Sequence, residues 1–202
     1  SILGGGNFVS DQQFSNGISL DDNTSRLRVG GSGTSVSHVR IQDSSGLAVL
    51  EALKNWNDEC DQGQADASGS GFIENLEHLG SFKIELEDES SLVLNQNLEV
   101  LDNQTISVDG SGIGTLVLGD NLSLSGSLLF DGETLLSGGT LKISDGVLHV
   151  NDDSRIDSDI LLQDEGGTIT LDAQKSLTIK SSLEIGVEQK LVLLGGSSAN
   201  LE

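Results

Sequence analysis

Short runs of alternating apolar and polar residues recur through the second half of the chain. Fifteen such runs begin between Ser91 and Lys190, about seven residues apart, and Gly, Asp, Asn or Ser separates them. Each run has three to five residues with a period of two, which is the pattern of a β-strand with one buried face. The residues expected to face inward are Leu116/Leu118, Leu122/Leu124, Leu141/Ile143, Leu148/Val150, Ile169/Leu171, Leu177/Ile179 and Leu191/Leu193.

The even spacing of these short strands favours a coil. Turns of two to four residues suit its corners, and three strands make a rung of about 21 residues, within the usual range of solenoid periods. An antiparallel sandwich or meander is the alternative, but its strands are longer, with turn signals every 8–12 residues. We therefore predict an all-β fold, a β-solenoid (parallel β-helix), with its repeats over residues 81–202.

The first 80 residues have a different pattern. Irregular strand-like runs with Gly-rich turns come first. One side at helical spacing then follows, made of Leu47, Leu50, Leu53, Lys54 and Trp56. We predict one helix at about residues 46–57, with Ser44 or Ser45 as its N-cap.

A short helical turn is also predicted in the segment GFIENLEHLGSF, with Ile73, Leu76 and Leu79 facing one way. An open solenoid end exposes unpaired backbone, so a helix or irregular segment there acts as a cap. We thus divide the chain into residues 1–80, an N-terminal cap or interaction region, and residues 81–202, the solenoid.

Charge and composition exclude several classes of protein. The 202 residues include 32 Asp and Glu against ten Lys and Arg, for a net charge of −22, which argues against binding nucleic acid or an anionic membrane. No apolar run is long enough to span a bilayer as a helix, so no transmembrane segment is expected. The single Cys excludes an intrachain disulfide framework and a multi-Cys zinc site. The chain begins with Ser1, so we interpret it as a processed chain or an excised segment.

Proline is absent, although an average composition of roughly 5% predicts about ten prolines in a chain of this length. Proline has no N–H and interrupts a ladder of paired strands. Its absence is therefore what we expect where nearly every backbone N–H is needed for pairing. It is also compatible with growth by pairing between subunits.

The segments GGTLKISDGVLHVNDD, GGTITLDAQKSLTIKSS and GTLVLGDNLSLSG resemble repeats of extracellular bacterial β-solenoids, namely autotransporter passengers and filamentous adhesins. The resemblance covers about 115 of the 202 residues and leaves out residues 1–80. It implies an exported, elongated protein at the cell surface or outside the cell, with a structural or adhesive role and no catalysis.

Acidic residues are the one group that suggests a ligand. Many fall in or beside the predicted turns, and in a coil the turns stack about 5 Å apart, so that rows of carboxylates repel unless cations lie between them. The densest patch, Asp152, Asp153, Asp157 and Asp159, is a candidate Ca²⁺ site, although it lacks the spacing of known calcium loops. The alternative is that Asp simply favours turns and keeps the surface soluble. The stacked candidates are Asp102, Asp109, Asp120, Asp131, Asp145, Asp152, Asp153 and Asp164.

We predict no catalytic or cofactor-binding residues. The three His residues are scattered, the acidic surroundings of Cys60 weaken its thiol as a nucleophile, and the Gly-rich stretches lack the Lys of a phosphate loop. A carboxylate pair, as in glycoside hydrolysis, is the enzyme alternative. Only 3% of the residues are aromatic, which weakens that alternative because sugar-binding sites commonly use aromatic platforms.

Three functions follow from these patterns. The first is an extracellular structural protein that self-associates into a surface fibre, filament or layer. The second is an adhesin passenger that binds a cell surface or glycan. The third, which we rank last, is a solenoid carbohydrate-active enzyme.

Overall fold

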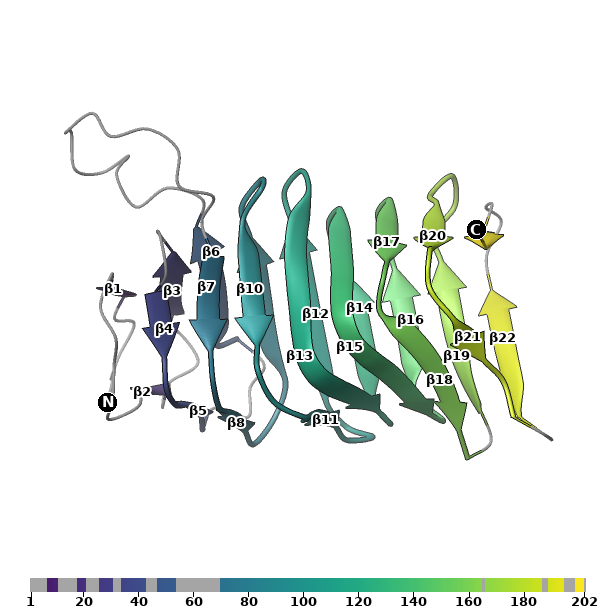
Figure 1. Cartoon of the computed structure of the whole chain (residues 1–202), viewed down its shortest axis with the longest axis horizontal. Helices are drawn as coiled ribbons and strands as arrows, with labels where there is room; N and C mark the ends of the chain where they lie inside the picture. Colours follow the sequence, from purple (N-terminus) through teal and green to yellow (C-terminus); the bar gives the residue numbers. More distant parts are fainter. Residues whose placement is uncertain are drawn as a thin grey trace.

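The chain folds as a parallel β-solenoid of about six turns. The computed structural model describes residues 7–10, 18–20, 26–30, 34–42, 47–53, 70–164, 166–186, 189–194 and 199–201. The turns stack along one axis, so that strands far apart in the sequence lie side by side and the two ends of the chain lie at opposite ends of the stack (Figure 1). No helix long and apolar enough to cross a membrane is present among the described residues.

Each turn runs along three sides, and all the pairings between turns are parallel. The first side is a nine-stranded sheet. It contains β1 (Asn7–Ser10), β3 (Arg26–Gly30), β6 (Val49–Leu53), β9 (Phe82–Leu86), β12 (Thr105–Gly110), β14 (Ser127–Phe130), β16 (Val147–Val150), β19 (Gly166–Leu171) and β22 (Lys190–Leu194).

The second side begins an eleven-stranded sheet, which bends to supply much of the third side. The second side consists of β4 (Thr34–Val36), β7 (Ser70–Ile73), β10 (Ser91–Leu94), the first parts of β13 (Gly114–Leu124) and β15 (Thr134–Ser144), β17 (Ser154–Ile156), β20 (Leu177–Ile179) and β23 (Ala199–Leu201). The third side consists of β2 (Ile18–Leu20), β5 (Val39–Ile41), β8 (Leu76–His78), β11 (Leu98–Val100), the second parts of β13 and β15, β18 (Asp159–Gln163) and β21 (Leu183–Glu184).

The two longest strands make the bend between these sides without a break. In β15 the bend falls at Gly138 and Gly139, both with positive φ, and in β13 the register shifts between Leu118 and Asn121. Positive φ is accessible to glycine at little cost, which allows one strand to turn the corner and remain paired.

The core is made of columns of apolar side chains, one from each turn. In one column Ile106, Leu128, Leu148 and Ile169 lie in register on successive strands, and each is no more than 1% exposed. Burying a side chain of this size contributes about 1.5–3 kcal/mol. Each turn therefore gains much of its stability from its two neighbours.

The predicted alternation is confirmed. The described side chains on the inward list are buried, except Leu171 and Leu191, which are half-buried against the core. The predicted rung is confirmed too: Val108, Phe130, Val150 and Leu171 pair in sequence, so that successive turns contain 22, 20 and 21 residues.

The helix predicted at about residues 46–57 is wrong for Val49–Leu53, which form β6. The spacing of Leu47, Leu50 and Leu53 fits a helix, but Leu47 is half exposed, while Val49 and Ala52 are buried. Pairing with β3 on one side and β9 on the other satisfies the backbone of this segment, and this tertiary context outweighs local spacing. Residues 44–46, which include the predicted N-cap, and residues 54–57 lie outside the described residues.

The helical turn predicted within residues 71–82 is also wrong. Its residues form β7, β8 and the start of β9, and Leu79 is 70% exposed instead of sharing a buried side with Ile73 and Leu76.

The ladders run across residue 80, where the pattern placed the boundary of the cap. β6 pairs with β9, and β7 pairs with β10, so the described strands before residue 80 belong to the same solenoid. That residues 1–80 act as a unit of their own stays a prediction.

The corners that lead from the third side back to the first differ in width. Leu101–Gln104 forms a four-residue turn, whereas Ser125–Gly126 and Asp145–Gly146 occupy the same place in the next two turns. A Cβ on Gly146 would lie 2.3 Å from the carbonyl oxygen of Leu124, so only glycine fits this narrow corner without a shift of the backbone.

Candidate functional site

The four aspartates predicted to bind Ca²⁺ lie at two different corners. Asp152 and Asp153 precede β17, while Asp157 and Asp159 follow it, so the length of the strand separates the two pairs. The structure therefore brings each pair together but not all four. Among the residues that the structure describes, no group of three or more His, Cys, Asp or Glu side chains is placed to hold a metal ion.

Two of these aspartates accept hydrogen bonds from the next turn. The Asp153 carboxylate accepts from the backbone N–H and the hydroxyl of Ser176, at 2.8 and 2.7 Å, and Asp159 accepts from the same groups of Ser182, at 3.2 and 2.6 Å. These bonds favour the charged carboxylates and lower the pKa of both Asp153 and Asp159.

The other two aspartates form ion pairs. Asp152 pairs with Lys175 of the next turn, which lowers the pKa of Asp152, and Asp157 pairs with Arg155 two residues before it, at 2.6 Å. All four carboxylates thus have protein partners that tie a corner together. Ca²⁺ binding by these residues stays a prediction.

A second set of acidic residues forms a column on the outer face of the nine-stranded sheet. Glu51, Glu85 and Asp109 are paired in register on β6, β9 and β12, and Asp131 follows at the end of β14. In the sequence, Asp109 lies 24 residues after Glu85 and Asp131 lies 22 residues after Asp109, close to the length of one turn, and this spacing is the signal that could place them in one column. Glu51 gives no such signal, because it lies 34 residues before Glu85.

Arginine neutralises one end of this column. Arg26 donates to Glu51 at 2.8 Å and to Glu85 at 3.1 Å, and Arg28 donates to Glu51 at 2.8 Å. Sequence reasoning missed these contacts, because the partners lie 23 to 59 residues apart.

Asp109 lies beyond the reach of these arginines. Its pKa is raised, first by loss of hydration against the neighbouring strands and then by the negative charges of Asp131 and Glu85, while Lys83 acts in the opposite direction. Asp131 is better compensated, since it accepts a hydrogen bond from the Asn151 amide at 3.0 Å. The stacking of acidic residues expected from the sequence is therefore present at Asp109 and Asp131.

The histidines have structural contacts. The His78 ring lies edge-on to Phe82, with its nitrogens 2.9 Å from the carbonyl oxygens of Gly80 and Glu99, and His149 lies 2.6 Å from the hydroxyl of Thr170. His38 lies 3.7 Å from Glu77. Cys60 lies outside the described residues.

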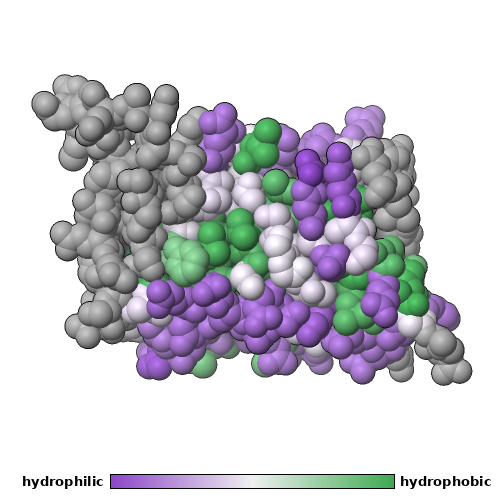
Figure 2. Space-filling view, in the orientation of Figure 1, coloured by the Kyte–Doolittle hydropathy of each residue, from purple (hydrophilic) through white to green (hydrophobic). Residues whose placement is uncertain are grey.

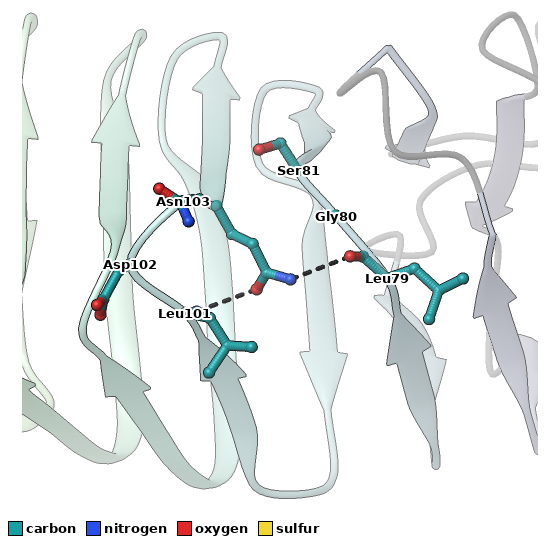
Figure 3. Close-up of a pocket in the computed structure, with 7 residues that line it drawn as sticks. Leu79, Gly80, Ser81, Leu101, Asp102 and Asn103 are labelled. Atoms are coloured by element: carbon teal, nitrogen blue, oxygen red, sulfur yellow. Dashed lines mark hydrogen bonds between the residues drawn. The ribbon is translucent and has the colours of Figure 1, made fainter.

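One surface hollow among the described residues is an open groove of about 540 Å³ between two successive corners (Figure 3). Gln104 spans it: the side-chain amide donates to the carbonyl of Leu79 at 3.2 Å and accepts from the N–H of Leu101 at 3.0 Å. Leu79 and Leu101 are 70% and 52% exposed at its rim. The groove is lined by Leu79, Gly80, Ser81, Leu101, Asp102, Asn103 and Gln104.

Another hollow, of about 280 Å³, lies where the first side meets the second. Ile113 and Leu135 give it an apolar part, while Glu133, Asp153 and Arg155 make the rest polar and charged. Asp153 already accepts a hydrogen bond from Ser176, and Arg155 already pairs with Asp157. The charged side chains of this hollow therefore serve to stabilise the corner.

An apolar stripe crosses the second side of the solenoid. Phe72, Val93 and Val117 pair in register on β7, β10 and β13, face outward and are half-buried, and Leu135 lies beside them on β15. Figure 2 shows green and pale side chains across the middle of this face and hydrophilic ones along its lower edge. Sequence reasoning missed the stripe because it had expected the outward positions to be polar.

Comparison with known proteins gives no relative. No protein-family model, no curated protein and no solved structure matches this chain.

Proposed function

We propose that the chain is a non-catalytic extracellular structural protein, located at the cell surface or outside the cell, that self-associates into a fibre, filament or layer. The observation that carries this proposal is the apolar stripe of Phe72, Val93 and Val117 on a regular parallel sheet. Sheet faces of this kind pack on one another about 10 Å apart. A second copy presents the same stripe in the same spacing, which makes the contact self-complementary.

The charge of the protein makes a second copy of the chain a better partner for the stripe than an anionic ligand. The net charge of −22 repels nucleic acid and anionic membranes, and it also opposes contact between copies at long range. Salt screens that repulsion, with a Debye length of about 8 Å at 0.15 M, but leaves the apolar contact intact. Self-association is therefore expected to strengthen as the salt concentration rises.

A non-catalytic role is supported by the interactions that already engage the carboxylates. Asp152 and Asp157 are paired with basic side chains, and Asp153 and Asp159 are held by serines of the next turn. The contacts of Asp152, Asp153 and Asp159 join successive turns, which suits a protein whose role is to remain rigid along its axis.

The stripe is tested by sedimentation velocity and negative-stain imaging across protein and salt concentration. Val93→Lys and Val117→Lys are expected to reduce self-association, because each places a charge on the stripe without touching the core. Ser137→Lys is the matched control, since Ser137 pairs with Val117 in the same column and is already polar. Melting temperatures of the three variants verify that the fold is kept.

Equal self-association of wild type and both valine variants would overturn the stripe as the contact. A wild-type protein that stays monomeric at all concentrations, yet binds cells or glycans, would replace this proposal with the adhesin alternative.

A further inference from the structure

We propose that Asn103 is an acceptor site for N-linked glycosylation, with an activated sugar as the second substrate. Asn103, Gln104 and Thr105 form the triplet Asn-x-Thr that N-glycosyltransferases recognise. The same triplet pattern, with Ser or Thr third, occurs at Asn121 and at Asn23. The structure distinguishes the first two, while Asn23 lies outside the described residues.

Asn103 lies at the tip of the wide corner. The turn is closed by the N–H of Gln104, which donates to the carbonyl of Leu101 at 2.8 Å, and Asn103 is exposed. Its side chain forms no hydrogen bond with the described residues and carries no dashed line in Figure 3. The Gln104 side chain, by contrast, makes two hydrogen bonds. The amide that reacts is thus free, and the middle residue of the triplet is fixed to the wall of the groove.

The third residue of the triplet is also held in place. The backbone N–H of Thr105 donates to the Ser81 hydroxyl at 2.8 Å, and the Thr105 side chain is half-buried at the very start of β12. Asn103 therefore precedes the strand, in a turn, where a transferase can reach the chain from the solvent side.

Asn121 has the opposite environment. It lies inside β13, paired with Thr140 of β15, and its side-chain amide donates to Asn97 and to Asp120, each at 2.8 Å. An asparagine amide has two hydrogens, so both are engaged here. Attaching a sugar to this nitrogen would remove one donor and require the strand to leave its partners.

The covalent step is a substitution at the anomeric carbon of a nucleotide-activated hexose. The Nδ2 atom of Asn103 forms a bond to C1, and the bond from C1 to the phosphate oxygen breaks, with its electron pair leaving on the nucleoside diphosphate. One amide proton passes to a basic group of the transferase. No oxidation or reduction takes place.

The test uses folded full-length protein carrying Asn23→Gln, a soluble N-glycosyltransferase that accepts Asn-x-Ser/Thr, and a nucleotide-activated glucose. Intact mass and peptide mapping follow the attached hexose over time. Asn103 is expected to gain one hexose at least about tenfold faster than Asn121, because reaction at Asn121 requires local opening of the ladder. Adding Asn103→Gln is expected to reduce incorporation into the folded protein to the slow rate of Asn121.

Urea-unfolded protein, diluted into the reaction immediately before the assay, is the control for the triplets themselves. There both Asn103 and Asn121 are expected to react. Modification of Asn121 as fast as Asn103 in the folded protein would overturn the proposal. It would equally be overturned if Asn103 stayed unmodified in the folded protein while reacting in the unfolded one.

Discussion

The corners at Leu101–Gln104 and Asp145–Gly146 occupy equivalent places in the solenoid and are built in different ways. At the narrow corner, the backbone of the glycine packs directly on Leu124 of the turn before. At the wide corner, a side chain fills the same space, because the Gln104 amide joins the carbonyl of Leu79 to the N–H of Leu101. The strands keep their register in both cases.

This difference shows where the chain tolerates variation. Along the nine-stranded sheet from β9 to β22, successive turns contain between 20 and 24 residues, yet the inward columns stay aligned, so the corners absorb the difference in length. At the wide corner, backbone polar groups of the corner itself and of the turn before it, the N–H of Leu101 and the carbonyl of Leu79, are satisfied by a side chain. The groove spanned by Gln104 and the exposed turn that carries Asn103 both result from the extra length of this corner.

The narrow corner is expected to be the more fragile. Gly146→Ala places a Cβ 2.3 Å from the Leu124 carbonyl oxygen, so the backbone must shift. We expect a loss of about 2–4 kcal/mol in the free energy of unfolding, measured by urea denaturation. Asp102→Ala, at the exposed wide corner, is the control and is expected to change stability by less than about 0.5 kcal/mol. Similar losses in both variants would contradict the contrast between the corners.

The wide corner should depend on its bridging side chain. Gln104→Ala removes two hydrogen bonds and leaves the carbonyl of Leu79 and the N–H of Leu101 to water, at an expected cost of about 1–2 kcal/mol. Asn103→Ala, which is next in sequence and makes no such bridge, is expected to unfold like wild type. If the two variants unfold alike, Gln104 does not stabilise the corner.

The corner after β14 is a third case. Here two like-charged carboxylates, those of Asp109 and Asp131, lie close together, and no side chain bridges backbone groups as Gln104 does. Asp109→Asn removes a like-charge neighbour of Asp131, which is expected to stabilise the protein by about 0.2–1 kcal/mol at pH 7. Because the pKa of Asp109 is raised by folding, protonation favours the folded state, and the advantage of Asn shrinks as the pH falls through this pKa. Melting temperatures from pH 7 to pH 3 test this; an advantage that persists at pH 3 would contradict it.

The smallest expected effect concerns Ca²⁺ at the corners flanking β17. The prediction of a site at Asp152, Asp153, Asp157 and Asp159 requires a higher melting temperature in millimolar Ca²⁺ than in EDTA. The competing serine and lysine contacts limit the gain. Asp153→Asn combined with Asp159→Asn should remove the difference, and Mg²⁺ at the same ionic strength controls for screening. Identical melting temperatures with Ca²⁺ and EDTA would exclude the site.

The repeats could be predicted because their signal is local. In pairs such as Leu116/Leu118 and Leu141/Ile143, alternation alone identifies the buried face, and both pairs are buried as expected. The segment at Val49–Leu53 could not be predicted in this way, since its spacing fits a helix and only its neighbours β3 and β9 make it a strand.

The candidate surfaces were harder to predict than the fold. Asp109 and Asp131 were expected to stack, and they do, because each follows the same position in its turn. The contacts of Arg26 and the apolar stripe depend on register between turns of unequal length, which a single sequence does not reveal. A run of aspartates such as Asp152–Asp159 is close in sequence, but a three-residue strand divides it.

The connection between β6 and β7 is much longer than the equivalent connections later in the chain. Between Leu53 of β6 and Ser70 of β7 the chain uses sixteen residues, where the equivalent corners between β12 and β13 or between β14 and β15 use three. Nevertheless β7 resumes in register with both β4 and β10. The position of β7 is therefore set by its neighbours and not by the connection that leads to it. We therefore expect the solenoid to accept a foreign peptide in place of residues 54–69 while the turns on either side keep their alignment.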